Sequence, residues 1–302
     1  MGSVALPDRP LAVGELLDSA ADLLRNRAKP LLALGLLLAL VEQCALAPLW
    51  AARLPFWEEP LSYLPWLACG LGFESLAIGL LTVYAGRAAR TALGGTPGGL
   101  VGPVLTAVAV AVVTLVAAFL LGAPWFVVYA LFGLAVPVAA VDNAAGSIGR
   151  SFRLVTAGSL RAGMIRILGY GAWLGIRIAV AAASTTVLDR LFDISDPIVT
   201  AGVWVLVNGI AYPALACLDV VLHLENRIRV EGLDIELGRA RATGRPVDDV
   251  LTPAPAGTGQ LPPGPATPNP AFRPPDSYHP PTRMPSDADY PDQPHTPLGR
   301  QR

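Results

Sequence analysis

The sequence predicts an all-α fold: a polytopic membrane helix bundle with six transmembrane helices, an N-terminal interfacial amphipathic helix and a disordered C-terminal tail. Three observations support this prediction: long apolar runs, arginines confined to alternate connecting segments, and a proline-rich C-terminus. A helix needs about 20 apolar residues to cross a hydrocarbon core, because no water there satisfies an unpaired backbone group. Six runs approach this length, at residues 31–50, 61–85, 100–121, 125–141, 167–188 and 198–222.

The composition agrees with residence in a bilayer, since 53% of the residues are hydrophobic and only 15% are charged. A net charge of −1 gives no electrostatic reason to expect a nucleic-acid partner, so the lipid bilayer is the main expected partner. The three cysteines, Cys44, Cys69 and Cys217, fall inside the runs without disulfide or zinc-ligand spacing. We interpret them as packing residues and expect no metal or cofactor.

Residues 1–29 form a segment with an amphipathic helix, because an apolar stripe recurs at helical spacing and acidic residues occupy the other face. The stripe consists of Val13, Leu16, Leu17, Ala20 and Leu24. Three basic residues follow it, Arg25, Arg27 and Lys29, and these are candidate contacts to lipid headgroups. We expect an interfacial helix, with docking on a partner protein as the alternative.

The basic residues also predict the orientation, since Lys and Arg in short loops stay on the cytoplasmic side. If the N-terminus is inside, the outer loops carry only Arg53 and Arg190. Arginine is used almost exclusively as the basic residue, which suggests a bacterial coding sequence, so we expect a multi-pass protein of the bacterial inner (plasma) membrane with both termini cytoplasmic. The weakest boundary lies between the third and fourth runs; one broken helix there instead of a hairpin would invert the orientation downstream.

Two further cytoplasmic stretches have helical patterns. After the fourth run, Asp142 is a candidate N-cap for a helix with an apolar stripe at Ile148, Phe152 and Val155. Its basic residues, Arg150, Arg153 and Arg161, are further candidate headgroup contacts. After the six-span bundle (residues 30–224), residues 225–245 predict an amphipathic helix with a bend at Gly232. Both stretches fit a collar at the membrane surface or a docking platform for a cytoplasmic protein.

The segment 246–302 has a different character, with 16 prolines in 57 residues and no long apolar run. Such a chain cannot bury enough surface to offset its conformational entropy, so we expect a disordered cytoplasmic tail. It contains PxxP patterns and threonines before proline, which fit peptide recognition or phosphorylation and also arise by chance in proline-rich chains.

Three segments resemble a known family. They are residues 9–11 with 14–18 (Arg-Pro-Leu and Gly-Glu-Leu-Leu-Asp), residues 151–155 (Ser-Phe-Arg-Leu-Val) and residues 227–237 (Arg-Ile-Arg-Val-Glu-Gly-Leu-Asp-Ile-Glu-Leu). They are similar to segments of bacterial, largely actinobacterial, integral membrane proteins related to the membrane domain of glycerophosphoryl diester phosphodiesterases. The resemblance implies a six-span bundle without the catalytic domain.

We do not expect an enzyme. The phosphodiesterase chemistry of that family belongs to a separate barrel domain with grouped metal ligands, and His223, His279 and His295 have no carboxylates at ligand spacing. What remains is a candidate intramembrane polar site, since charges within a span need a partner or a wet cavity. Its residues are Glu42, Glu74, Arg177, Asn208 and Asp219.

Two functions fit these features. The first is a non-enzymatic membrane scaffold or accessory subunit that binds other envelope or cytoplasmic proteins through the tail and the inner helices. The alternative is a transporter of a small solute or lipid, with Glu74 and Arg177 in a polar cavity. The plainer interpretation of the polar residues is that they form bonds between helices and fix the packing.

Overall fold

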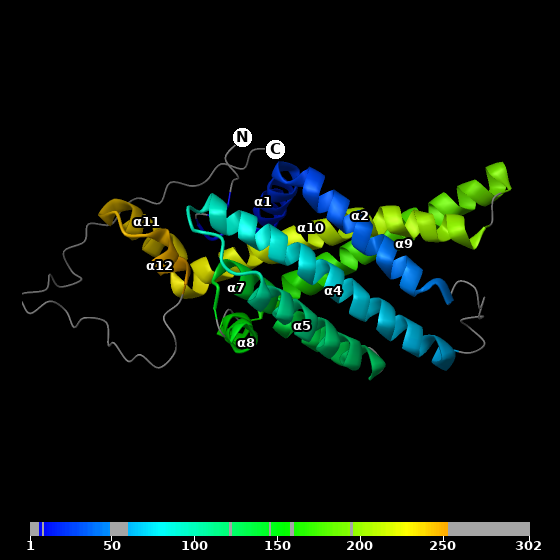
Figure 1. Ribbon diagram of the computed structural model, residues 1–302, viewed down its shortest axis with the longest axis horizontal. Coiled ribbons are helices and arrows are strands. Elements are labelled where there is room, and N and C mark those ends of the chain that lie inside the picture. The colour runs from blue at the N-terminus through cyan, green and yellow to red at the C-terminus, as the bar shows by residue number, and fades with distance from the viewer. Residues whose placement is uncertain are drawn as a thin grey trace, which may run out of the picture. The chain divides into compact units, whose positions relative to one another are not determined.

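A computed structural model describes residues 6–7, 9–48, 60–120, 123–144, 146–157, 160–193 and 196–252. Its spanning elements are all helical, and six of them are long and apolar enough to cross a membrane (Figure 1). The predicted all-α, multi-pass membrane bundle is therefore confirmed. The tail from residue 253 onward lies outside the described residues.

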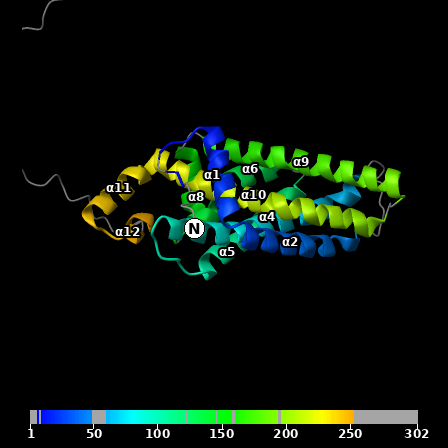
Figure 2. The ribbon, with the colours of Figure 1, turned by 90° about the horizontal axis from the view of Figure 1, so that it is seen from above.

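The six spans are antiparallel neighbours in chain order. They are α2 (Ala28–Ala45), α4 (Pro60–Ala92), α5 (Val101–Phe119), α6 (Ala123–Phe132) with α7 (Ala135–Val141), α9 (Arg161–Phe192) and α10 (Pro197–Glu231). α10 is the central helix: it packs against α2, α4 and α9, and Figure 2 shows it between α9 and α2. Nearly every residue of α10 from Ala211 to Ile228 is buried, and this span contributes more residues to the main hydrophobic core than any other helix.

Four shorter helices gather at one end of the bundle, which we call the capped end (Figures 1 and 2). They are α1 (Val13–Asn26), α8 (Ser147–Ala157), α11 (Leu233–Thr243) and α12 (Val247–Leu251). The opposite end, where α9 turns into α10, is the open end. The capped end holds the described parts of the N-terminal helix, the two inner connecting segments and the helix after the last span, which the sequence predicts to be cytoplasmic.

The fourth span is discontinuous. Residues 133–134 interrupt it between α6 and α7, four residues before Pro137, which has no N–H to donate to the Gly133 carbonyl. The hairpin between the third and fourth spans is nevertheless real, because Ala107 and Val110 of α5 pack against Ala135 and Val136 of α7. The alternative of one broken helix across both runs is therefore wrong, and the six-span count holds.

α1 is amphipathic as predicted, but only part of the predicted apolar stripe lies on the buried face. The helix packs on α10 and buries Leu16, Ala20 and Leu23, whereas Val13 and Leu17 are 48% and 50% exposed. It therefore docks on its own bundle through one face and leaves two apolar side chains facing outward. Docking on the bundle was neither of the two predicted alternatives.

The predicted cap at Asp142 is wrong. Asp142 directly follows α7 and is fully buried, whereas α8 begins at Ser147. The buried face of α8 includes Leu154 and Val155, while Ile148 and Phe152 of the predicted stripe are 39% and 44% exposed. The physical reason lies in the cationic neighbours of Asp142, described below, which bind this carboxylate more strongly than a helix N-terminus would.

Two predicted boundaries need correction: the end of the last span at residue 224 and the start of the tail at residue 246. α10 continues unbroken to Glu231, and Gly232 then turns the chain with a φ of +67°, which confirms the predicted bend. The segment 246–302 was predicted to be disordered throughout, but its first residues form α12, where Leu251 is fully buried. The folded part of the chain therefore extends to at least Thr252.

Candidate functional site

Four of the five predicted intramembrane polar residues meet in one cluster, which we call the membrane polar cluster. Glu42 comes from α2, Glu74 from α4, Arg177 from α9 and Asn208 from α10, and all four are at least 93% buried. Two tyrosines, Tyr170 of α9 and Tyr212 of α10, complete it. Because four spans contribute, the cluster ties together most of the bundle.

An ion pair forms the centre of the cluster. Arg177 Nη1 lies 2.7 Å from Glu74 Oε1, so each of these two charges within the spans has the other as its partner. Tyr170 donates its hydroxyl to the other carboxylate oxygen of Glu74 at 3.2 Å, and Arg177 donates to Asn208 Oδ1 at 3.4 Å. Arg177 Nε and Nη2 are buried without a hydrogen-bond partner in the described part of the chain.

Glu42 has a different environment. It accepts a hydrogen bond of 2.5 Å from the Tyr212 hydroxyl and another from Asn208. Asn208 therefore contacts both Glu42 and Arg177, and it links Glu42 to the ion pair that Arg177 makes with Glu74.

Asp219, the fifth predicted residue, does not belong to this cluster. It lies eleven residues after Asn208 on α10, about 16 Å along the helix axis. There it pairs with Arg166 of α9 through two hydrogen bonds of 2.6 and 2.9 Å. The prediction of one site with five members is wrong, because α10 places two acceptors at different depths and each finds its own arginine.

The Arg166–Asp219 pair is built into the break in the fourth span. Arg166 also donates to the Tyr129 carbonyl and lies 3.6 Å from the centre of the Tyr129 ring. The interruption of the helix frees this carbonyl, and Arg166 satisfies it. A Cβ at Gly133 would collide with the Arg166 guanidinium, so glycine leaves the space that the guanidinium occupies.

A second set of charges fixes the capped end. Asp142 contacts Arg150 at 3.1 Å, Arg227 at 2.9 Å and His223 at 3.0 Å. Burial raises the pKa of the Asp142 carboxyl, but the His223, Arg227 and Arg150 side chains outweigh it and hold this pKa below its ordinary value. Asp142 is therefore a buried anion that joins α7 to α8 and α10.

Two further ionic contacts hold peripheral segments. Glu225 of α10 binds Arg161 at 2.8 Å and also Arg229, and both arginines donate to the Leu11 carbonyl just before α1. Asp248 of α12 binds the buried Arg90 of α4 at 2.6 Å. Charged side chains thus attach the segment before α1 and the helix α12 to the bundle.

Asp248 also accepts hydrogen bonds from the Thr96 hydroxyl and backbone, at 2.7 and 3.0 Å. The Thr96 hydroxyl is the largest cause that lowers the pKa of the Asp248 carboxyl, and Arg90 lowers it further. Arg227 donates to the carbonyls of Val250 and Leu251, so α12 is bound from two sides.

The predicted headgroup contacts separate into two groups. The predicted headgroup contacts of Arg150 and Arg161 are wrong, because the ion pairs above hold their guanidinium groups against the protein. Arg25, Lys29 and Arg153 are exposed and Arg27 is half-buried, so these four stay candidates. Arg25 lies 3.3 Å from Asp22 on its own helix, a contact compatible with a headgroup nearby.

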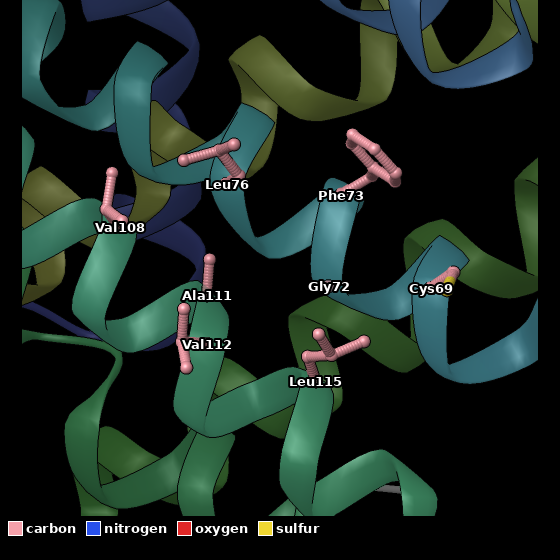
Figure 3. A pocket seen from close by; sticks show the side chains of 8 residues that line it. All are labelled: Cys69, Gly72, Phe73, Leu76, Val108, Ala111, Val112 and Leu115. Atoms are coloured by element: carbon pink, nitrogen blue, oxygen red, sulfur yellow. The ribbon is translucent and has the colours of Figure 1, made fainter. Parts of the chain in front are cut away.

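An apolar groove of about 190 Å³ lies between α4 and α5, within the spanning parts of both helices. Figure 3 shows its walls, with Phe73 and Leu76 from α4 and Val108, Ala111, Val112 and Leu115 from α5. Cys69 lines the same groove, whereas Cys217 is buried and Cys44 is exposed, so only Cys217 has the packing role expected of all three. The lining contains no charged group, so the groove suits only hydrocarbon.

Sequence reasoning missed several members of these clusters. Tyr212 and Arg166, the partners of Glu42 and Asp219, were not among the predicted members of the site. A detectable signal exists for the second pair, because α9 and α10 are consecutive antiparallel spans and the two residues lie at similar distances from the turn between them. Arg166 lies 26 residues before the end of α9, and Asp219 lies 22 residues after the start of α10. Within the described residues, no group of three or more His, Cys, Asp or Glu side chains could hold a metal ion.

Comparison of the chain with models of known protein families, with curated proteins and with solved structures gave no match.

Proposed function

We propose that this multi-pass membrane protein is a non-enzymatic scaffold or accessory subunit of an envelope complex in the bacterial inner membrane. In this proposal the capped end and both termini face the cytoplasm, because the capped end carries the basic residues of the connecting segments. The three segments that resemble the phosphodiesterase membrane domain support the same placement and bring no catalytic group.

The observation that carries the proposal is the exposure of α9. Beyond Tyr170, the only buried residues of this helix are Arg177 and Ala181, although it continues to Phe192. A stripe of small residues with a spacing of four, Gly171, Gly175, Ala179 and Ala183, is exposed, and a Cβ at Gly171 or Gly175 would meet nothing within 4 Å. Small residues at this spacing allow the backbones of two membrane helices to approach closely.

The internal pairing of the charges supports the same conclusion. Arg166 and Arg177 each have an acidic partner inside the bundle, so these groups act as bonds between helices. Arg90, Arg150 and Arg227 do the same at the capped end. A bundle fixed in this way presents its remaining helix surfaces in one arrangement, which suits a scaffold.

The test is to purify the full chain in a mild detergent and to measure the mass of the native particle with its bound proteins. A Gly175→Leu variant should lose a bound protein that the wild type retains, because the side chain fills the space of close helix approach. Val112→Phe, on the exposed face of α5, is the matched control and should retain it. A wild-type particle that contains only this chain and lipid would refute the proposal.

The transporter alternative is favoured by one observation: the Nε and Nη2 groups of the buried Arg177 have no hydrogen-bond partner within the residues that the structure describes. A transported anion would bind there. Thermal unfolding of the wild type and Arg177→Gln in a panel of small carboxylates and phosphates tests this alternative. A stabilising solute that acts on the wild type and not on the variant would favour transport over a scaffold.

A further inference from the structure

The membrane polar cluster has an unequal number of charges. Two carboxyl groups, Glu42 and Glu74, are 5% and 7% exposed, and they face one guanidinium, that of Arg177, which is 2% exposed. The other polar groups in contact with them, Tyr170, Tyr212 and Asn208, are neutral. With both carboxyl groups ionised, the cluster would carry a net negative charge within the membrane.

The contacts identify which acid is the anion. Glu74 has the direct ion pair with Arg177 and an additional hydroxyl donor. Glu42 receives its two hydrogen bonds from Tyr212 and Asn208, and it also experiences the charge of Glu74. A second negative charge here would lose its hydration and meet a like charge, and both effects favour the neutral acid.

We propose that Glu42 binds a proton at neutral pH and that Glu42, Glu74 and Arg177 together form a single-proton site in the membrane. Glu74 is the ionised partner of Arg177, and the cluster as a whole is neutral. The groups that face Glu42 from the helices packed against it are Glu74 on α4, Tyr212 and Asn208 on α10, and Arg177 through Asn208 on α9.

Release of the proton has a structural consequence. The O–H bond of the Glu42 carboxyl breaks, the proton passes to water, and the electron pair stays on the carboxylate. Two nitrogen atoms of Arg177, Nε and Nη2, have no hydrogen-bond partner among the described residues, so Arg177 can bind a second carboxylate while it keeps Glu74. Deprotonation therefore draws α2 and α9 toward each other through the Asn208 bridge of α10. This inference is independent of the proposed scaffold function, because it concerns the interior of the bundle.

Infrared spectroscopy of the full chain in lipid nanodiscs tests the proposal, since a protonated carboxyl has a C=O stretch separate from that of carboxylates. The wild type should show one such band near neutral pH, and Glu42→Gln should remove it. Glu74→Gln should also remove it, because Glu42 then ionises to neutralise Arg177. Tyr212→Phe should shift the band to higher frequency, since the acid loses its hydroxyl donor.

Glu236→Gln is the matched control, because Glu236 is exposed on α11 outside the spans and its removal should leave the band unchanged. The wild-type and Tyr212→Phe spectra decide the question even if an acidic variant fails to fold. Absence of the band from the wild type near neutral pH would refute the proposal. A band that survives in Glu42→Gln would assign the proton to another residue and would refute it equally.

Discussion

The Arg166–Asp219 pair offers the strongest test of how charges hold this bundle together. We expect Asp219→Asn to destabilise the protein severely, because it leaves the Arg166 cation buried at 5% exposure without its anion. The variant removes a two-bond contact of 2.6 and 2.9 Å between α9 and α10. The Tyr129 carbonyl and ring remain as partners for the cation.

The expected loss follows from the burial of both groups. Removal of one partner from a buried ion pair typically costs about 3–5 kcal/mol, whereas replacement of both by apolar residues of similar volume is often neutral. An ordinary hydrogen bond between membrane helices contributes on average only about 0.6 kcal/mol. We therefore expect about 3 kcal/mol or more for Asp219→Asn and for Arg166→Met, and a smaller loss for the double variant Arg166→Met with Asp219→Leu.

Reversible unfolding in mixed detergent micelles, followed by circular dichroism, gives the free energies for this double-mutant cycle. Glu236→Gln, an exposed acid on α11, serves as the control and should change stability little. Additive single losses, or a loss of only about 0.6 kcal/mol for Asp219→Asn, would show that the pair contributes no more than a hydrogen bond. The interpretation of these charges as the main bonds between the spans would then be wrong.

Three further predictions concern other contacts. Glu74→Gln and Arg177→Gln should each destabilise, and the double variant should recover part of the loss in thermal unfolding; strictly additive losses would contradict the ion pair. A chain truncated after position 245 should be less stable by roughly 2 kcal/mol or more than one truncated after position 252, because it loses the buried Leu251; equal stabilities would exclude a role for α12. The lowered pKa of Asp248 means that its contribution is present above the unfolded value of about 4 and is lost as the pH falls through the folded value. Acid should therefore expose α12 to proteolysis, and Asp248→Asn should do so at neutral pH; undiminished protection in both cases would refute the linkage.

Hydropathy predicts where the spans are but not where the helices end. The run at 198–222 is the apolar part of α10, yet the helix continues to Glu231 through Glu225, Arg227 and Arg229. From hydropathy alone, these charged residues would be placed outside the span, in contact with water. They remain in a buried helix because each finds a partner from another segment, such as Asp142 for Arg227 and Arg161 for Glu225.

The sequence predicts which residues of the spans make polar contacts, but it predicts less well which of them contact one another. A charge inside an apolar run indicates a polar contact whatever the fold, which is why Glu74 and Arg177 could be named. Whether two such residues meet depends on the rotation and depth of their helices, which hydropathy does not specify. Asp219 was therefore grouped with the wrong arginine, and the attachment of Asp248 to Arg90, 158 residues earlier, left no local signal.

The membrane architecture itself is tested most directly by the accessibility of single cysteines in a chain that lacks Cys44, Cys69 and Cys217. Suitable positions are Gly99 and Gly238 at the capped end, where a Cβ meets nothing within 4 Å, and the exposed Arg190 at the open end. On intact cells, an impermeant maleimide should label position 190 only, and positions 99 and 238 should react after the membrane is permeabilised. Labelling of position 99 or 238 from outside would contradict a six-span bundle whose capped end lies in the cytoplasm.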